Sequence, residues 1–324
     1  MLKIAVVWDW VNEPMQIWGW MDGIAAMIRE LGKKAEVKVY TQMTGVQRET
    51  VVQNPYFLVY TYKDYEQMQF SVEADSPDVV LFWSDFTRPA IPYLTQRFPC
   101  GVLFAGGEPI LENTHKFKVI FTESAVYTER LKVAGLNAVQ AFGTNTELFK
   151  PKSQPKLFDV FFPACFAAWK RHDLFAESVK GMRALACGWF QEHEPWCYEA
   201  CQKAGVLTIP HVPSHLLPDL YNASKCVLIT SDSTGGSQRS VLEAMACNVP
   251  CIVMSDSDKT SEYIRAAGAD VLISEPNPQA IREKVSIVTS FTEGNLDTRN
   301  WIIKNYSEYT YAQKVYDNLC QLVS

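Results

Sequence analysis

Short apolar runs alternate with longer amphipathic segments along the whole chain of 324 residues. The first run, at 3–9, is rich in β-branched residues, and the segment at 19–33 has apolar positions at helical spacing up to Gly32. Strands that alternate with helices in this way predict a parallel sheet that is covered by helices on both faces. In the first half the pattern predicts further strands at 35–41, 56–62, 78–84, 101–107 and 118–124, and a helix at 124–136.

A change in composition divides the chain near its middle. Residues 150–156 are rich in proline, lysine and serine and poor in apolar residues, so they predict a linker. The alternation then resumes with a strand at 158–164 and a helix at 173–186. It continues with strands at 205–210, 226–231, 250–255 and 270–274, with helices at 214–224, 238–247, 260–268 and 278–291, and with an amphipathic helix at 309–323.

We therefore expect an α/β protein that is built from two Rossmann-like, doubly wound domains. Residues 1–150 form the predicted N-terminal domain and 151–305 the predicted C-terminal domain, and the terminal segment 306–324 is expected to pack back on the N-terminal domain. Sheets of this kind bind ligands at the carboxyl ends of their strands. Two such edges that face a shared central cleft would suit an enzyme with two substrates.

Composition and charge narrow the class of protein. Hydrophobic residues make up 48% of the chain and charged residues 20%, which is ordinary for a soluble globular protein, and the net charge of -6 offers no general surface for nucleic acids. No apolar run is long enough for a membrane span, and the first residues lack the features of a secretory signal. Nine scattered cysteines predict reduced thiols in a cytoplasmic protein.

One cysteine-containing segment has a spacing that could suit a metal. His193, Cys197 and Cys201 recur every four residues and could share one face of a helix. A tetrahedral site needs a fourth ligand, and none is evident. A helical face of buried thiols accounts for the same spacing, so we predict no metal site.

One carboxylate, Glu243, stands among the apolar residues of a predicted helix. It follows a loop in which Gly235 and Gly236 would let a phosphate approach the unpaired backbone N–H groups at the start of that helix, with Ser237 as its N-cap. A buried charge is costly unless it is hydrogen-bonded, and the two hydroxyls of a ribose would suit a carboxylate acceptor. The alternative is an ordinary exposed glutamate on the helix surface.

Four segments, in this order, resemble one known family. They are VQAFGTNTELFKP at 139–151, FPACFAAWKRHDLFAESV at 162–179, TIPHVPSHLLPDLYNASKCVLITS at 208–231 and SQRSVLEAMACNVPCIVMSDSDKTSEYI at 237–264. Their sequences and spacing resemble the retaining family 4 glycosyltransferases (glycosyl transferases group 1), which have the GT-B fold. The resemblance covers about 142–273 well, and the N-terminal half follows the family in outline.

This resemblance implies roles for the residues that match. Glu243 would bind the ribose hydroxyls of a nucleotide-sugar donor, and Lys170 would neutralise the donor diphosphate. Arg171 either shares that work or is a solvated surface charge, and the stretch that ends at Val212 would touch the nucleobase. The backbone that would cradle the phosphates comprises Gly236, Ser237, Gln238, Arg239 and Ser240.

Two departures from the family pattern concern the donor site. The family's first glutamate, eight residues before the second, is replaced by Gly235, and the arginine five residues before the lysine is replaced by Cys165. Asp232 could substitute for the missing acid, or it could form an Asx turn. Asn248 occupies a glycine position, which is harmless because asparagine tolerates the left-handed conformation after a helix.

The N-terminal half would bind the acceptor, as the N-terminal domain mostly does in GT-B enzymes. Its first strand is followed by a long aromatic loop, where a tryptophan could stack on a sugar or base or could be ordinary core or surface. The candidates in that loop are Asp9, Trp10, Gly19 and Trp20. Asp85 and Glu108 each follow a later strand and could hydrogen-bond or deprotonate an acceptor hydroxyl, or could cap the next helix.

The resemblance thus implies a metal-independent, retaining glycosyltransferase that needs no cofactor beyond its nucleotide-diphosphate sugar donor. The acceptor would be a hydroxyl of a glycan, a lipid, a protein or a modified base. Three alternatives stay open. They are a nucleotide-sugar-binding protein with weak or no transferase activity, a nucleotide-sugar epimerase on a similar frame, and a transferase that acts on a modified nucleic-acid base.

Overall fold

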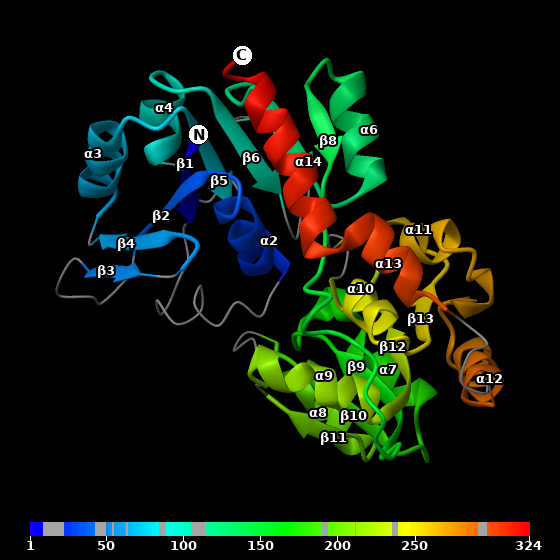
Figure 1. The fold of residues 1–324 in the computed structure, drawn as a ribbon. Coiled ribbons are helices and arrows are strands. Elements are labelled where there is room, and N and C mark those ends of the chain that lie inside the picture. Colours follow the sequence, from blue (N-terminus) through cyan, green and yellow to red (C-terminus); the bar gives the residue numbers. More distant parts are fainter. Residues whose placement is uncertain are drawn as a thin grey trace. The chain divides into compact units, whose positions relative to one another are not determined.

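The computed structural model divides the chain into two compact units, each built on a parallel sheet (Figure 1). Unit 1 comprises Met1–Gly143 and Glu308–Ser324, and unit 2 comprises Thr144–Ser307. The predicted fold class, two doubly wound α/β domains, is confirmed. The structure describes residues 1–8, 23–42, 50–53, 55–62, 64–83, 89–104, 114–189, 194–210, 212–234, 239–290 and 297–324.

Unit 1 contains an eight-stranded sheet in the order β3-β4-β2-β1-β5-β6-β7-β8. Neighbouring strands pair in parallel, except that β3 runs antiparallel to β4. The pattern of apolar runs had no strand at β3, which forms the edge of the sheet. The strands are β1 (Lys3–Trp8), β2 (Glu36–Gln42), β3 (Thr50–Gln53), β4 (Leu58–Tyr62), β5 (Val79–Trp83), β6 (Cys100–Phe104), β7 (Val119–Thr122) and β8 (Ala138–Gln140).

Helices cover both faces of this sheet because successive strand residues point to opposite sides. Val6 belongs to the core cluster that α2 (Gly23–Gly32) and α14 (Glu308–Gln321) complete, and Figure 1 shows these two helices on one side of the sheet. Val7 belongs to the second cluster, on the opposite face. The helices that contribute to this second cluster are α3 (Tyr65–Asp75), α4 (Ala90–Thr95) and α6 (Ala125–Val133).

Unit 2 contains a six-stranded, wholly parallel sheet in the order β11-β10-β9-β12-β13-β14. Its strands are β9 (Phe158–Pro163), β10 (Ala184–Cys187), β11 (Leu207–Ile209), β12 (Ser224–Ile229), β13 (Cys251–Met254) and β14 (Ile273–Ser274). Its helices are η1 (Ala168–Lys170), α7 (His172–Ser178), α8 (Pro195–Lys203), η2 (Ser214–Leu216), α9 (Leu217–Asn222), α10 (Arg239–Ala246), α11 (Asp258–Ala266), η3 (Asp270–Leu272), α12 (Pro278–Thr289) and α13 (Arg299–Tyr306).

The unit boundary lies at Thr144, a few residues before the predicted division at 150, and the chain returns to unit 1 at Glu308. The reason is hydrogen bonding to unit 2. The backbone N–H of Thr144 donates to the carbonyl of Tyr306 at 2.9 Å, and that of Lys152 donates to the side chain of Asn222 at 2.8 Å. The proline-rich stretch at 150–156 therefore runs along unit 2.

The helix predicted at 173–186 is wrong. α7 ends at Ser178, a turn follows in which Gly181 has a φ of 80°, and Ala184–Cys187 form the strand β10 between β9 and β11. All four residues of β10 are buried. A short, fully apolar run does not distinguish a buried strand from a continuing helix. The predicted helix was therefore extended wrongly through the residues of β10.

Candidate functional site

The order of strands in unit 2 reverses between β9 and β12. The chain proceeds from β9 through β10 to β11 on one side, and from β12 through β13 to β14 on the other. In doubly wound sheets the crevice at the carboxyl ends of such a pair of strands is where ligands bind. Lys170 follows β9, and Asp232 and Glu243 follow β12, so three predicted donor-site residues lie in the segments after these two strands.

Hydrogen bonds join the segment after β9 directly to the segment after β12. The hydroxyl of Thr230 donates to the carbonyl oxygen of Lys170 at 2.7 Å. The backbone N–H of Asp232 donates to the carbonyl of Trp169 at 3.1 Å. Because residues some 60 positions apart are bonded in this way, the backbone around Lys170 has a fixed position relative to the end of β12.

Lys170 is the last residue of η1 and is only 5% exposed. Its ammonium nitrogen lies 3.9 Å from the centre of the Trp169 ring, an attractive cation–π contact. The start of the turn is held by Glu194, whose carboxylate accepts a hydrogen bond from the backbone N–H of Ala168 at 2.7 Å. A lysine with so little exposure is unusual, and here it lies at the edge where doubly wound sheets generally bind ligands.

The guanidinium of Arg171 is engaged in contacts within the protein. Its guanidinium forms a bidentate pair with Asp256, with N···O distances of 2.6 and 2.9 Å, and also donates to the carbonyls of Thr230 and Ser231. These bonds tie the ends of β12 and β13 to the loop of Lys170. A phosphate contact of Arg171 stays a prediction, and it would compete with this pair.

Glu243 lies in α10 with 8% exposure, and its carboxylate accepts a hydrogen bond at 2.8 Å from the hydroxyl of Tyr221. It is therefore a buried acid and not an exposed surface glutamate. Burial and, second, the negative charge of Glu243 raise the pKa of Tyr221 well above its ordinary value, so the tyrosine stays protonated and donates. Its role toward a ribose stays a prediction.

The remaining predicted donor residues are partly described. The carboxylate of Asp232 accepts a hydrogen bond from the backbone N–H of Thr234 at 2.8 Å, the contact of an Asx turn. Arg239 and Ser240 form the first turn of α10, and half-buried Val212 precedes η2. The other members of the predicted cradle, Gly235, Gly236, Ser237 and Gln238, lie outside the described residues.

The predicted acceptor residues of unit 1 also lie outside the described residues. They are Asp9, Trp10, Gly19, Trp20, Asp85 and Glu108. The strand order of unit 1 reverses between β1 and β5, and the last residues of these strands, Trp8 and Trp83, are partners in register. Their ring centres lie 5.2 Å apart. This aromatic pair was missed from the sequence, where the only signal is that each tryptophan ends an apolar run.

Two residues that support the Lys170 loop were also missed. A Cβ on Gly188 would lie 2.0 Å from the carbonyl oxygen of Ala164, so the loop after β9 crosses the end of β10 where only glycine fits. His172, fully buried, packs against the rings of Phe162 and Phe166 with centroid distances of 4.9 Å. Burial lowers the pKa of His172 to about 4, so the ring is neutral at pH 7.

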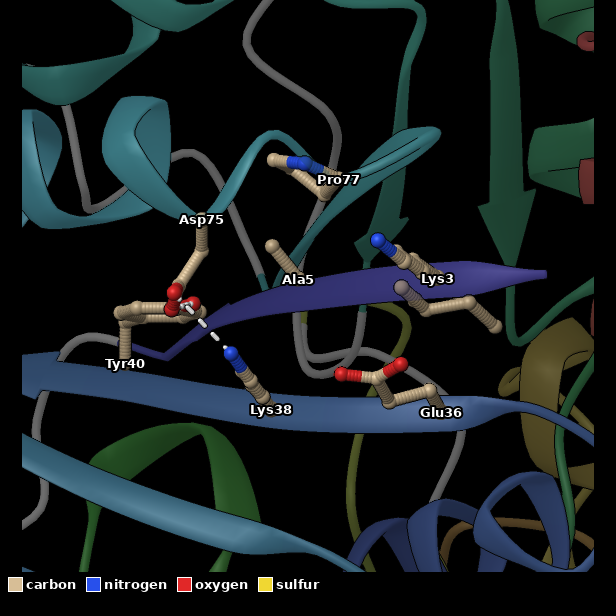
Figure 2. Close-up of a pocket in the computed structure, with 8 residues that line it drawn as sticks. Lys3, Ala5, Glu36, Lys38, Tyr40, Asp75 and Pro77 are labelled. Carbon is tan, nitrogen blue, oxygen red and sulfur yellow. Dashed lines mark hydrogen bonds and ion pairs between the residues drawn. The ribbon is translucent and has the colours of Figure 1, made fainter. Parts of the chain in front are cut away.

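A small pocket in unit 1 is lined by polar residues near the amino ends of β1 and β2 (Figure 2). The ammonium of Lys38 lies 3.0 Å from the carboxylate of Asp75, which also accepts a hydrogen bond from Tyr40. Burial and this hydrogen bond raise the pKa of Tyr40. Because Lys38, Tyr40 and Asp75 bond to one another, we interpret these polar residues as a cluster that stabilises the fold.

Two kinds of feature are absent from the described residues. No helix among them combines the length and the apolar character that crossing a membrane requires. Within the same residues, no group of three or more His, Cys, Asp or Glu side chains is arranged to hold a metal ion. Of the segment with four-residue spacing, Cys197 and Cys201 are buried in α8, and His193 lies outside the described residues.

Comparisons with known proteins agree with this architecture. The chain has a TM-score of 0.77 with sucrose-phosphate synthase from Thermosynechococcus elongatus, at 12% identity and with 99% of each chain covered. It has a TM-score of 0.74 with an E. coli structure described as trehalose-6-phosphate bound with UDP-2-fluoro glucose, at 10% identity and 98% coverage of each chain. For Anabaena Alr3699/HepE in complex with UDP the TM-score is 0.70, at 14% identity, with 99% of this chain and 100% of that chain covered.

Sequence comparison gives the family. No curated protein sequence matches the chain. The family described as Glycosyl transferases group 1 matches residues 144–306, which is half of the chain and nearly all of unit 2. The chain therefore belongs to the glycosyl transferases group 1 family, and it is a glycosyltransferase with the GT-B fold.

Proposed function

We propose that this glycosyltransferase moves a sugar from a nucleoside diphosphate to a hydroxyl acceptor with retention of configuration, and that unit 2 binds the donor. One observation carries the proposal. A buried cation, Lys170, and a buried carboxylate, Glu243, lie in the segments that follow β9 and β12, the two strands between which the strand order of unit 2 reverses. A diphosphate needs positive charge and a ribose diol needs hydrogen-bond acceptors, and this edge offers both.

In the proposed reaction the bond between the sugar and the diphosphate breaks, and negative charge develops on the leaving phosphate. Lys170 and the positive end of the helix dipole of α10 stabilise that charge. The departing phosphate takes the proton of the acceptor hydroxyl, which attacks from the same face, so the configuration is retained. No metal or cofactor beyond the donor takes part in this scheme.

Two further properties belong to the proposal. Relatives of this fold are described in complex with UDP or UDP-2-fluoro glucose, so uridine diphosphate sugars are the first donors to test. All nine cysteines are free thiols, most of them buried, which favours a reducing compartment such as the cytoplasm.

A second candidate is a nucleotide-sugar-binding protein with weak or no transferase activity. It is favoured by Gly235, which supplies no carboxylate where the family has its first glutamate, and by Asp232, whose carboxylate accepts a hydrogen bond within an Asx turn. Such a protein would keep the diphosphate and ribose contacts but would lack a group beside the sugar.

The test is a transfer assay with radiolabelled UDP-, GDP- and ADP-sugars, on the wild type and Lys170→Ala. We expect the wild type to transfer or hydrolyse at least one donor, and Lys170→Ala to lose about 100-fold or more in kcat, because it removes a charge that acts on the leaving group. Lys180→Ala is the matched control, since Lys180 is exposed and pairs with Glu177. Full activity in Lys170→Ala would refute the role of Lys170, and donor binding without hydrolysis or transfer would favour the second candidate.

A further inference from the structure

Tyr221 donates a hydrogen bond to Glu243, and its ring is packed inside unit 2. It lies in α9, its side chain is fully buried, and its hydroxyl donates to the carboxylate of Glu243 at 2.8 Å. Phe149 and Phe161 contact its ring edge-on, with centroid distances of 5.7 and 5.2 Å. The hydroxyl therefore points in one fixed direction.

The hydrogen bond has a fixed polarity. Burial and the nearby negative charge of Glu243 raise the pKa of Tyr221, so the phenol keeps its proton and the carboxylate is the acceptor. A second acceptor, the carbonyl of Ser240, is farther away at 3.4 Å. If the carboxylate turned away, the buried hydroxyl would lose its best acceptor, so Tyr221 restrains the rotation of the Glu243 carboxylate.

A restrained carboxylate matters for the recognition of a vicinal diol. The two hydroxyls of a ribose are fixed on one ring, and a carboxylate that accepts from both must hold its plane in one orientation. One bond from Tyr221 occupies one of about four acceptor positions on the two carboxylate oxygens. The bond from Tyr221 by itself therefore does not prevent the carboxylate from accepting from a diol.

We propose that Tyr221 is a positioning residue that orients Glu243 toward the ribose diol and thereby gives the protein its preference for ribonucleotides over 2′-deoxyribonucleotides. The inference rests on the proposed function, in which Glu243 binds the ribose. Tyr221 itself does not touch the nucleotide in this scheme. It acts through the direction that it imposes on the Glu243 carboxylate.

A packing role for Tyr221 predicts a different result. If the tyrosine only filled the core, its loss would weaken the binding of a ribonucleotide and of the matching deoxyribonucleotide by the same factor. If it orients Glu243, the ribonucleotide loses more affinity than the deoxyribonucleotide, because the ribonucleotide offers two hydroxyls to the carboxylate and the 2′-deoxy compound offers only one.

The experiment is calorimetric titration of wild type, Tyr221→Phe and Tyr263→Phe with UDP and 2′-deoxy-UDP, or with the GDP or ADP pair if that nucleotide binds better. Tyr263 is an equally buried tyrosine in α11, so its variant controls for the loss of a buried hydroxyl. We expect the wild type and Tyr263→Phe to prefer the ribonucleotide by about tenfold or more, and Tyr221→Phe to bring that preference to about threefold or less.

Two results would overturn the inference. Tyr221→Phe could keep the full ribose preference, or it could weaken both nucleotides equally, and each outcome leaves the proposed role of Glu243 intact. A wild type that binds the nucleotide without any ribose preference would instead refute the ribose role of Glu243, and the inference with it. Phe149→Leu loosens the ring of Tyr221 but keeps its hydroxyl, and it should give an intermediate preference even if Tyr221→Phe does not fold.

Discussion

The carboxyl edges of the two sheets have a similar topology and opposite chemistry. In unit 2, β9 and β12 end in loops that are joined by hydrogen bonds, and these loops lead to a buried lysine and a buried glutamate, Lys170 and Glu243. In unit 1, β1 and β5 end in Trp8 and Trp83, whose rings contact each other. One edge concentrates charge, and the other holds a largely buried pair of tryptophans.

The difference shows how one frame carries two edges of different chemistry. A doubly wound sheet determines where a ligand can bind, and the residues after its strands determine which ligand binds. Holding charges in place requires bonds between distant segments, such as that of Arg171 to Asp256, whereas the tryptophan pair needs only two adjacent strands. We therefore expect variants at the unit 2 edge to change nucleotide binding and variants at the unit 1 edge to leave it unchanged.

Gly188→Ala should have the largest effect, because the added Cβ would lie 2.0 Å from the carbonyl oxygen of Ala164. The backbone of the Lys170 loop must shift, so we expect a loss of about 3 kcal/mol in unfolding free energy and the loss of nucleotide binding. Urea denaturation and calorimetry measure the two. The control, Gly205→Ala, has a φ of 78° with no described atom near the Cβ, and should cost about 1 kcal/mol. Equal effects of both variants would contradict the packing argument.

Glu243→Gln should weaken nucleoside diphosphate binding by about 1.5–3 kcal/mol, because the carboxylate would lose charge-assisted hydrogen bonds to the ribose. The amide oxygen can still accept from Tyr221, so the unfolding free energy should change by less than about 1 kcal/mol. Calorimetry on the folded variant measures the affinity, with exposed Glu177→Gln as control. An unchanged affinity for the nucleoside diphosphate would contradict the proposed role of Glu243 at the unit 2 edge.

His172 should make the unit 2 edge sensitive to acid. Its pKa is about 4 in the folded protein because of burial, and near 6.5 in the unfolded chain. As the pH falls below about 6.5, the unfolded chain binds a proton that the folded protein does not, so stability is lost until about pH 4. Between pH 7.5 and pH 5 we expect this residue to cost about 2 kcal/mol of unfolding free energy. In urea denaturation His172→Leu should lose that part of the pH dependence, and an unchanged pH dependence would contradict the assignment.

Trp83→Phe should have the smallest effect. The indole N–H of Trp83 is buried and has no hydrogen-bond partner among the described residues, so its removal leaves no described acceptor unpaired. We expect a change of at most about 1 kcal/mol in unfolding free energy, and no change in nucleotide affinity. A loss above about 2 kcal/mol would contradict this expectation and show that the packing of the indole ring contributes more than we expect.

The sequence predicts the frame of this molecule better than its site. Alternating apolar runs and amphipathic segments are local, and they predicted most of the strands and helices of both sheets. The strand β10 was missed because Ala184–Cys187 are apolar at every position and carry no period. Lys170 and Glu243 could be singled out because motif residues lie close to them in sequence. Their partners could not, since the pairs of Arg171 with Asp256 and of Tyr221 with Glu243 exist only once the sheet brings their loops together.

The most direct test of the central claim is a crystal structure with a bound nucleoside diphosphate, starting with UDP. The account predicts the diphosphate within hydrogen-bond distance, about 3 Å, of the Lys170 ammonium, and the ribose hydroxyls on the Glu243 carboxylate. Lys170 would then contact the phosphates in place of the Trp169 ring that it contacts here. A nucleotide bound beside Trp8 and Trp83, or anywhere away from Lys170 and Glu243, would contradict the account.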